Sequence, residues 1–546
     1  MKKTIITIIL ALIFINVNAQ APNWEWAKSA GGNGDDWGTS TTTDPFGNVF
    51  VTGFYTDTIT FGSFTLFNEG NKDMFIVKYD ATGNVLWAKG AGGSGEDKGN
   101  SIATDSQGNV YVTGIFAFDS IAFGGFTLIN SGAINVFIVK YDSNGNVLWA
   151  KNNLGVGNNQ GKGICTDALG NVYITGFFSG SYFLFGSDTL YNSPGNFNDM
   201  FLVKFDASGN TLWAKSEGGS QSEQGLSTTT DPSGNVYVTG VYVTSSITVG
   251  TYTLVNSGVD YNLFIVKYDS SGNVIWAKSG MGSVSDWGFS PTIDASGNVY
   301  ITGYYNSPSI TFGSFTLTND GLNDIFVVKY DASGNVQWAK RAGGNSYDFC
   351  LSASADANGI ILTGYFGSPT ITFGSTTLTN LNGGYDIFIV QYDFNGNVLW
   401  ADGIDATSGS IYATCINSDP SGNLYITGYY NSSSITFGAT TLSAVSDYDM
   451  FISKLAYTEV GINNVNNQNG INIYPNPTSG IFTIQNSNLR LQSCTIKNLL
   501  GAFVYTQNSN LTNQINIDLS AQAKGIYFVE LFDENNSRIN KKVIIE

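Results

Sequence analysis

The sequence contains no histidine. Histidine is the commonest general base and the commonest ligand of transition metals, so its absence excludes Ser-His-Asp triads and imidazole metal sites together. The four cysteines show no Cys-x-x-Cys spacing, which argues against a zinc site or a dithiol redox motif. We expect no catalytic residues, no cofactor and no bound metal. The cysteines are expected to be free and buried, with a Cys350–Cys415 bridge between neighbouring repeats as the alternative; they are Cys165, Cys350, Cys415 and Cys494.

Positive charge is also scarce. The 24 Lys and Arg residues stand against 42 Asp and Glu residues, which gives a formal net charge of −18. Nucleic acids and anionic membrane surfaces both demand basic patches, so neither is an expected partner. After the first twenty residues no apolar run approaches the length of a membrane helix, and we do not expect an integral membrane protein.

Residues 1–19 have the pattern of a signal peptide. Lys2 and Lys3 give a basic start, residues 5–15 form an apolar run too short to span a bilayer, and residues 17–19 resemble a small-residue cleavage site. The mature chain is therefore predicted to begin near Gln20 and to be exported.

What the sequence has in abundance is a repeat. The stretch from Asp231 to Gly240 reads Asp-Pro-Ser-Gly-Asn-Val-Tyr-Val-Thr-Gly, and close copies return at intervals of 61 to 64 residues. A fixed period of this size predicts a repeat architecture. The copies begin at Asp44, Asp105, Asp167, Asp231, Asp294, Asp356 and Asp419.

The repeated stretch predicts a tight turn followed by a strand. Asp can accept a hydrogen bond from the backbone two residues on, Gly supplies positive φ, and Val-Tyr-Val-Thr suits a packed pleated surface. The same turns could instead offer oxygen ligands to calcium. The twelve-residue calcium loop, however, needs several more acidic positions than these turns carry. We interpret them as turns.

Each repeat holds four strand-like runs, which in the second repeat are residues 99–104, 109–116, 136–141 and 146–151. Both faces of these strands are apolar, so each sheet must be covered on both sides. Seven such units are all covered when they pack around a ring. The sequence therefore predicts an all-β fold with a seven-bladed β-propeller over residues 20–458.

The two ends of the repeat array predict how the ring closes. Residues 23–28 match the fourth strand of a repeat but precede the first complete unit. The last repeat reaches its third strand at residues 450–454 and then stops. We expect the N-terminal strand to complete the last blade.

A tryptophan recurs in the fourth strand of every repeat. It is either a platform for stacking sugars or an anchor between adjacent sheets, and its mid-strand position favours the anchor. These residues are Trp26, Trp87, Trp149, Trp213, Trp276, Trp338 and Trp400.

The loops divide between two sides of the predicted ring. One side carries only short Asp turns, whereas the other carries inserted hairpins, such as residues 310–317, and the connections between repeats. We expect any binding on this second, long-loop side. Its aromatic residues either stack on sugars beside carboxylates or pack under the hairpins. The candidate ligand-binding residues are Asp36, Trp37, Asp97, Asp286, Trp287, Tyr304, Asp348 and Tyr429.

The Asp-x-x-Gly-Asn-Val-Tyr-Val-Thr-Gly and Phe-Ile-Val-Lys-Tyr-Asp patterns resemble the SBBP family of β-propeller repeats over residues 23–458. The resemblance implies a seven-bladed fold and no particular activity. Two copies depart from the pattern: the sixth lacks the Asn after Gly359, and the seventh replaces the Gly-Gly connection with residues 406–410.

Beyond the repeats, an Asn-rich linker is expected at residues 459–470 and a small Ig-like β-sandwich at residues 471–546. The motifs of this tail resemble the type A sorting domain of the type IX secretion system. That resemblance implies passage through the periplasm and the outer membrane with the secretion machinery as partner, commonly with removal of the domain and attachment of the cargo to lipopolysaccharide. The chain would be secreted or held at the cell surface. The motif residues are Tyr474, Pro475, Asn476, Pro477, Gly480, Lys524 and Gly525.

Three classes of function remain open. The first is an exported, non-catalytic propeller, such as an adhesin, that binds an extracellular glycan or protein. The second is a secreted hydrolase or lyase acting on carbohydrate, which would need two carboxylates about 5–10 Å apart; no such pair stands out from the repeats. The third is a passive structural protein of a surface layer.

Overall fold

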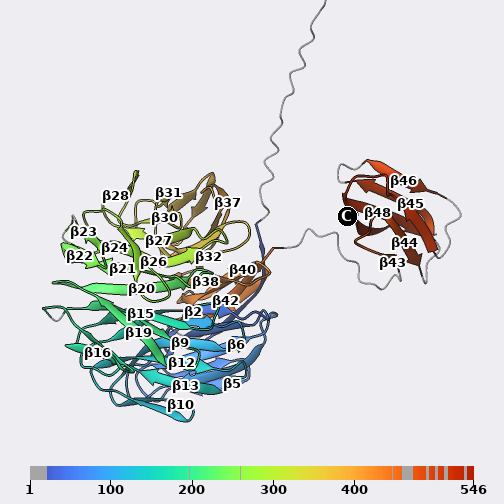
Figure 1. Cartoon of the computed structure of the whole chain (residues 1–546). Helices are drawn as coiled ribbons and strands as arrows, with labels where there is room; N and C mark the ends of the chain where they lie inside the picture. The colour runs from blue at the N-terminus through green and yellow to red at the C-terminus, as the bar shows by residue number, and fades with distance from the viewer. Residues whose placement is uncertain are drawn as a thin grey trace, which may run out of the picture. The chain divides into compact units, whose positions relative to one another are not determined.

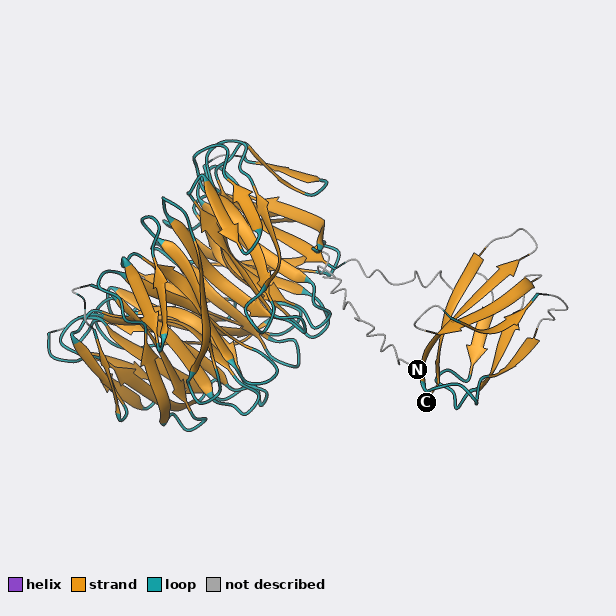
Figure 2. Cartoon of the chain, turned by 90° about the horizontal axis from the view of Figure 1, so that it is seen from above, coloured by secondary structure: helices purple, strands orange, loops and turns teal. Residues whose placement is uncertain are grey.

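The computed structural model describes residues 21–195, 197–256, 258, 260–445, 447–457, 471–486, 491–498, 502–508, 514–533 and 538–545. Over these ranges the chain forms strands and loops and no helix, which confirms the predicted all-β class (Figure 2). It divides into two compact units, Met1–Tyr457 and Thr458–Glu546. The predicted signal peptide and linker lie outside the described residues.

The first unit contains seven four-stranded antiparallel sheets, which are the blades of a propeller. Blades one to three are β2 Asp36–Thr43, β3 Val49–Tyr55, β6 Asp73–Tyr79, β7 Val85–Ala91; β8 Lys98–Thr104, β9 Val110–Ala117, β12 Ile134–Tyr141, β13 Val147–Asn152; and β14 Gln160–Thr166, β15 Val172–Phe178, β18 Asp199–Phe205, β19 Thr211–Glu217. Blades four to six are β20 Glu223–Thr230, β21 Val236–Tyr242, β24 Asn262–Tyr268, β25 Val274–Ser279; β26 Asp286–Ile293, β27 Val299–Tyr305, β30 Asp324–Tyr330, β31 Val336–Ala342; and β32 Asp348–Ala355, β33 Ile360–Phe366, β36 Asp386–Tyr392, β37 Val398–Ile404.

Blade seven joins the two ends of the repeat array. It consists of β38 Ile411–Ser418, β39 Leu424–Tyr430, β42 Asp449–Ala456 and β1 Asn23–Ala30. β1 pairs with β42 from Asn23 opposite Ala456 to Ala30 opposite Met450, with a bulge after Trp24. The predicted closure by the N-terminal strand is confirmed.

The first strands of the blades form the innermost ring. β2 contacts β8, contacts of the same kind continue through β14, β20, β26 and β32, and β38 contacts β2 again. In Figure 1 the colours follow the chain around this ring, and blue β2 lies beside brown β38 and β42. The hydrophobic cores lie between neighbouring blades; one joins Ala103 and Tyr111 of blade two to Ile164 and Phe178 of blade three. Sheets with two apolar faces are thereby covered on both sides.

The recurrent tryptophans anchor each blade to the next. Trp87 Nε1 of blade one donates to the carbonyl of Ser143 in the outer turn of blade two (3.2 Å), and Lys78 Nζ donates to the same carbonyl (3.0 Å). The same pair of bonds recurs in blades two to five and from blade seven to blade one. This confirms the interpretation of the tryptophans as anchors between sheets.

Blade six departs from this device because it faces the closing strands. Blade seven has no turn between its third and fourth strands, since β42 and β1 are not consecutive in the chain, and so offers no turn carbonyl. Gln391 stands in place of the lysine and its Oε1 accepts hydrogen bonds from Trp400 Nε1 (2.7 Å) and Tyr457 Oη (2.6 Å). Its Nε2 donates to both oxygens of Asp356, which has no Asn partner after Gly359.

The insertions between second and third strands form seven two-stranded hairpins. They lie along the outer edge of the blades, because each packs against the fourth strand of its own blade. Buried residues such as Ile59 and Phe61 fix the hairpin there. The hairpins therefore cover the blade edges. They are β4 Thr58–Phe61 with β5 Phe64–Phe67, β10 Ser120–Phe123 with β11 Phe126–Ile129, β16 Tyr182–Phe185 with β17 Asp188–Tyr191, β22 Ser246–Val249 with β23 Tyr252–Val255, β28 Ser309–Phe312 with β29 Phe315–Thr318, β34 Thr370–Phe373 with β35 Thr376–Thr379, and β40 Ser434–Phe437 with β41 Thr440–Ser443.

The second unit has two antiparallel sheets around one core, which agrees with the predicted sandwich. The first sheet is β43 Ile471–Tyr474, β44 Ile481–Asn486 and β47 Gln514–Asp518; the second is β46 Phe503–Gln507, β45 Leu491–Asn498, β48 Gly525–Asp533 and β49 Arg538–Ile545. Both sheets contribute to a core that includes Ile484, Ile496, Ile517 and Val529.

Candidate functional site

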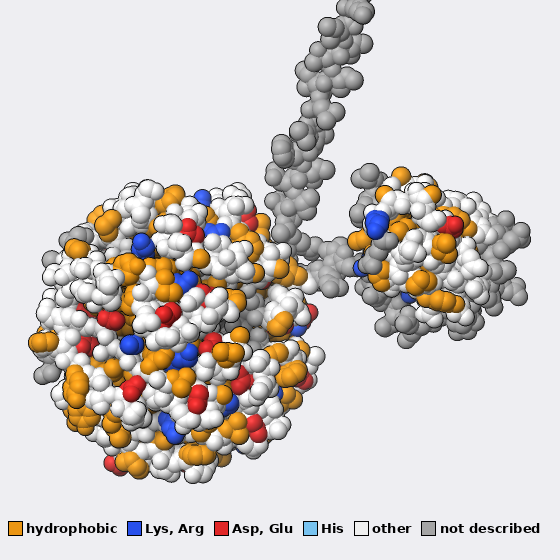
Figure 3. Space-filling model, viewed as in Figure 1, with side chains coloured by type: hydrophobic (Ala, Val, Ile, Leu, Met, Phe, Trp, Pro, Cys, Tyr) orange, Lys and Arg blue, Asp and Glu red, His pale blue; other side chains and the backbone are white. Residues whose placement is uncertain are grey.

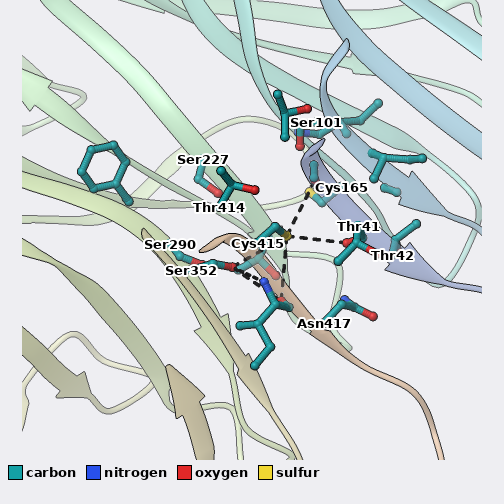
Figure 4. A pocket seen from close by; sticks show the side chains of 18 of the residues that line it. Thr41, Thr42, Ser101, Cys165, Ser227, Ser290, Ser352, Thr414, Cys415 and Asn417 are labelled. Carbon is teal, nitrogen blue, oxygen red and sulfur yellow. Dashed lines mark hydrogen bonds between the residues drawn. The ribbon is translucent and has the colours of Figure 1, made fainter. Parts of the chain in front are cut away.

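The innermost strands line a central cavity of about 800 Å³. Its wall carries mainly hydroxyl groups because the first strands are rich in Ser and Thr. Figure 4 shows Thr41, Ser101, Ser227, Ser352 and Thr414, which come from five different blades, around this space. A smaller hollow of about 460 Å³ adjoins it on the side of the Asp turns.

Partly exposed aromatic side chains border the cavity on the long-loop side. We call this set the aromatic arc; it comes from blades five, six, seven and one, and its rings touch in sequence. Between Tyr304 and Trp37 successive ring centroids lie 3.9–4.9 Å apart, and the Trp37–Tyr429 pair is stacked within 9°. The members are Trp287, Phe289, Tyr304, Phe349, Tyr365, Tyr385, Tyr412, Tyr429, Tyr448 and Trp37.

Period-two alternation explains which aromatics reach the arc. The second strands end in aromatic pairs, and the two members of a pair point to opposite faces of the sheet. Tyr304 lies in the arc, whereas Tyr305 is buried and donates to the Thr318 carbonyl of its hairpin (2.8 Å). Packing under the hairpin thus holds for Tyr305, while Tyr304 stays partly exposed beside the cavity.

We call the opening of the cavity on the long-loop side its mouth. Lysines lie at the part of the mouth opposite the aromatic arc. Lys98 Nζ lies 2.6 Å from Glu96 Oε1 and 4.9 Å from the ring centroid of Phe54. Lys162 lines the cavity, with Nζ 5.8 Å from the centroid of Phe177. Burial and the neighbouring charge of Lys98 lower the pKa of Lys162 to about 8.

The four candidate aspartates lie beneath the long-loop surface, which corrects their expected place on it. Asp36, Asp97, Asp286 and Asp348 are at most 1% exposed. Asp97 Oδ2, for example, accepts the backbone N–H of Gly93 (2.7 Å). These carboxylates hold the connections between blades, because a loop that packs closely must satisfy its backbone donors internally.

Burial also shifts how these acids titrate. It raises the pKa of Asp36, Asp97 and Asp286 to about 7, and it also raises the pKa of Asp348. Perturbed acids often mark active sites. Here the pattern recurs at several blade junctions, and Asn159 takes the corresponding place in blade three. Repetition with an amide replacement indicates a structural role.

The carboxylates explain the Gly-Gly connections. Asp73 opens the third strand of blade one, and its negative charge further raises the pKa of Asp97 across the junction. A Cβ on Gly92 would lie 2.2 Å from Asp73 Oδ1, so no larger residue fits there. The Gly-Gly motif therefore marks a close approach of loop and carboxylate.

The Asp turns on the other side use their carboxylates within the turn. Asp231 Oδ1 accepts the N–H groups of Ser233 and Asn235, while Oδ2 accepts the Asn235 side chain and the Tyr237 hydroxyl. Over the described ranges, no cluster of three or more acidic or Cys side chains is placed to hold a metal ion. The cysteines are free, and Cys165 and Cys415 line the central cavity.

The structure brings together four of the predicted site residues: Trp37, Trp287, Tyr304 and Tyr429. Sequence reasoning missed Lys162 and six members of the arc, which are Phe289, Phe349, Tyr365, Tyr385, Tyr412 and Tyr448. Phe349, Tyr412 and Lys162 lie on first strands. When the repeats are aligned, Phe349 and Tyr412 match Trp37, and Lys162 matches Thr39, so comparing these two variable positions would have found all three.

In the second unit, the predicted sorting motif is held against the last strand. Asn476 Nδ2 donates to the Lys542 carbonyl (2.8 Å), and the Ile544 N–H donates to Asn476 Oδ1 (2.9 Å). Leu519 N–H donates to the Gly480 carbonyl (2.7 Å). Tyr474 and Lys524 are exposed, and Gly525 begins β48.

Comparison with family models agrees with both units. Residues 86–114 match the SBBP β-propeller repeat, and residues 472–546 match the secretion-system C-terminal sorting domain. The first unit is thus a β-propeller that carries an SBBP-type repeat at residues 86–114. More particularly, the C-terminal sorting domain marks the chain for export by the type IX secretion system to the cell surface or the extracellular space.

Curated relatives are distant. An uncharacterized WD repeat-containing protein of Acanthamoeba polyphaga mimivirus is 27% identical over 532 residues, covering 79% of this chain and 38% of that protein. Regulatory protein FlaEY of Caulobacter vibrioides is 26% identical over 136 residues, covering 24% of this chain and 14% of that protein. The chain thus spans well under half the length of either.

Among solved structures, the Neurospora crassa Pan2 WD40 domain is similar at 7% identity and a TM-score of 0.36, covering 77% of this chain and 89% of that one. A variant of apocarotenoid oxygenase from Synechocystis is similar at 10% identity and a TM-score of 0.37, covering 81% and 96%. The described part of the chain contains no helix with the length and apolar character needed to cross a membrane.

Proposed function

We propose that this exported propeller is a binding module that takes a glycan at the mouth of its central channel. The observation that carries the proposal is the aromatic arc, a continuous band of partly exposed rings beside a cavity of about 800 Å³. Flat apolar rings with polar edges suit the faces of sugar rings, and hydroxyl-rich walls suit their edges. Export places the module where extracellular glycans are found.

The shape of the scaffold supports a recognition role for this side. The opposite side repeats the same short turn, whereas the residues that begin the first strands change from blade to blade. Trp37, Lys98, Gln160, Phe349 and Tyr412 occupy equivalent positions. Such variety on a rigid ring is what a specific surface requires.

The test compares aromatic substitutions inside and outside the arc. Trp37→Ala with Trp287→Ala is expected to weaken binding to glycans identified on an oligosaccharide array by more than about tenfold, as the loss of buried aromatic contacts usually does. Tyr191→Ala is the control, because Tyr191 is 74% exposed on hairpin strand β17, away from the arc. Equal loss in the control, or unchanged binding in the Trp variant, would contradict the proposal.

A further inference from the structure

The charge of the channel wall is opposite to that of the protein. The whole chain has a formal charge of −18. Among the described residues that line the cavity, none is acidic, and Lys162 is the one with a formal charge. The wall otherwise offers hydroxyl groups, the amides of Asn100 and Asn417, and apolar side chains. An acidic protein thus encloses a cavity whose one charged lining residue is basic, while the aspartates of the channel lie in the adjoining hollow on the side of the Asp turns.

Lys162 has no charge partner of its own among the described ion pairs. The ion pairs of this region join Lys72 and Lys98 to Glu96. Lys98 is close enough to Lys162 to disfavour its charge further, and Lys162 itself is half-buried over Phe177. The sequence has thus placed an ammonium group in a poorly solvated wall without a counter-ion. Such a group gains free energy when an anion arrives, because the anion supplies the missing partner.

The aromatic arc faces this ammonium from the other side of the mouth. Trp37, Phe289 and Tyr429 belong both to the arc and to the cavity lining that includes Lys162. A ligand that occupies the mouth can therefore place a ring against the aromatic side and a negative group toward Lys162. A small free anion could use only the second feature, and a neutral sugar only the first.

We propose that the glycan bound by this channel is acidic, with a carboxylate on its sugar ring that pairs with the Lys162 ammonium. This inference rests on the proposed glycan-binding function and names the class of glycan. Lys98 stays paired with Glu96, so Lys162 is the ammonium that lacks a carboxylate partner among the described ion pairs. Thr39, Asn100 and Ser101 also line the wall near this end of the first strands. The Thr39 hydroxyl and the Asn100 amide donate to the backbone carbonyls of Gly99 and Gly161, so their oxygen atoms are what they can offer to sugar hydroxyls.

Two probes that differ only in charge test the inference. Hexagalacturonate carries one carboxylate per sugar, and its methyl ester has the same rings without the charge. Calorimetric titration of the full-length protein is expected to show about 10–100-fold tighter binding of the acid, the range for hydrogen bonds to charged groups. Lys162→Gln should bring the two affinities together, whereas Lys162→Arg should keep the preference. Lys151→Gln is the matched control, because it removes the same charge from an exposed position on outer strand β13.

The outcomes separate the two proposals. Equal binding of both probes by the unchanged protein would overturn the acidic preference and leave glycan binding standing. Binding of neither probe would overturn the inference as stated, and the array experiment would then decide glycan binding by itself. Inorganic sulfate that competes as strongly as the hexamer would show a small-anion site and overturn the sugar assignment. Loss of preference in Lys151→Gln as well would show a general charge effect and also overturn it.

Discussion

At the scale of the residue, one pentapeptide sequence occurs in two turns of the propeller, and its aspartate makes different contacts in each. Asp294 and Asp331 each begin the pentapeptide Asp-Ala-Ser-Gly-Asn and each caps its own turn. Asp294 lies in an inner turn, where its buried carboxylate also accepts the Tyr300 hydroxyl (2.8 Å) and lies 4.0 Å from Lys329 Nζ. Asp331 lies in an outer, exposed turn. Position in the blade, not local sequence, sets how much each carboxylate stabilises.

Substituting both aspartates by alanine should reveal this difference. Asp331→Ala removes a turn cap and is expected to cost about 0.5–2 kcal/mol. Asp294→Ala also leaves the Tyr300 hydroxyl without its acceptor and the Lys329 ammonium without its carboxylate partner, although Lys329 keeps its bond to the Phe394 carbonyl, and is expected to cost about 3–5 kcal/mol. Denaturant unfolding of the two variants measures the difference. Equal costs would show that the contacts with Tyr300 and Lys329 add nothing.

The buried carboxylates of the blade junctions predict an unusual dependence of stability on pH. Burial raises the pKa of Asp36, Asp97 and Asp286 to about 7. Burial, together with the negative charge of Asp199, also raises the pKa of Glu223 to about 7. These values lie far above those in an unfolded chain. A raised pKa means that the folded state binds the proton more tightly. The stabilisation that each of these carboxyl groups adds to the free energy of unfolding is therefore complete below about pH 4 and is lost as the pH rises through 7.

We expect a melting temperature about 5 °C or more higher at pH 5 than at pH 8, since each pH unit per group corresponds to about 1.4 kcal/mol at most. Asp97→Asn should reduce the difference, because Asn159 shows that an amide fits the same position. Differential scanning calorimetry between pH 4 and 9 is the measurement. A melting temperature that rises with pH over this range would contradict the assignment.

The same residues show what the sequence could reveal of the site. Trp37 was predicted because it is an aromatic residue in a connection between repeats, and Tyr429 because it belongs to the aromatic pair at the end of a second strand. Asp36 and Asp97 were placed on the wrong side of the surface, because an acidic residue beside Gly-Gly reads as an exposed loop. Only the packed structure shows that the glycines bring the loop down onto the carboxylate. Lys162 was not predicted, because a single lysine on a strand forms no sequence pattern that indicates a site.

At the scale of the element, period-two alternation was enough to predict four strands per blade and the closing role of the N-terminal strand. In the second repeat, the predicted runs differ from β8, β9, β12 and β13 by at most two residues at an end. The place of the hairpins was not predictable from their own sequence. They fold along the blade edge because residues such as Phe61 find a buried surface against neighbouring strands, and that contact is long-range.

The closing contact also explains why the sixth repeat departs from the others. Gln391 replaces the lysine where blade seven has no turn carbonyl to accept its hydrogen bond, and its amide supplies the donors that the missing Asn would give to Asp356. The two departures of the sixth repeat, Gln391 in place of lysine and the missing Asn after Gly359, thus compensate for the break in the chain between β42 and β1.

Deleting residues 21–30 tests the contribution of the closing strand. The deletion exposes the edge of β42 and removes Trp26 and Ala30, which are buried in the core between blades seven and one. Loss of the Trp contacts alone is expected to cost about 3–5 kcal/mol, and the melting temperature should fall sharply.

A synthetic peptide of residues 21–31 should restore part of the melting temperature when added in trans, whereas the same peptide with Trp26→Ala should not. An unchanged melting temperature in the deletion variant would show that the ring is held closed without β1.

At the scale of the whole molecule, the two units have separate cores and separate tasks. The charges on the face of the first unit seen in Figure 3 are scattered and of both signs, so that face offers no extended basic or acidic surface. The sorting motif of the second unit is tied to its own last strand through Asn476. Composition and motif were sufficient to predict this division, because each unit is a cooperative structure with its own pattern.

Removing residues 471–546 should therefore separate folding from export. Among the described residues, those that form the propeller cores all belong to the first unit. The truncated chain is therefore expected to keep its melting temperature within about 2 °C, the change that a perturbation of 1 kcal/mol or less produces in a domain of this size. It should accumulate in the periplasm, because the sorting domain that addresses it to the secretion machinery is gone. Cell fractionation with immunodetection of the propeller measures its location, and calorimetry of the purified fragment measures its folding. Asn476→Ala in the full-length chain is the finer version, since it loosens the motif from β49 without shortening the chain. Normal export of the truncated chain would contradict the assignment of the tail as the sorting signal, and a propeller that no longer melts cooperatively would contradict the independence of the two units.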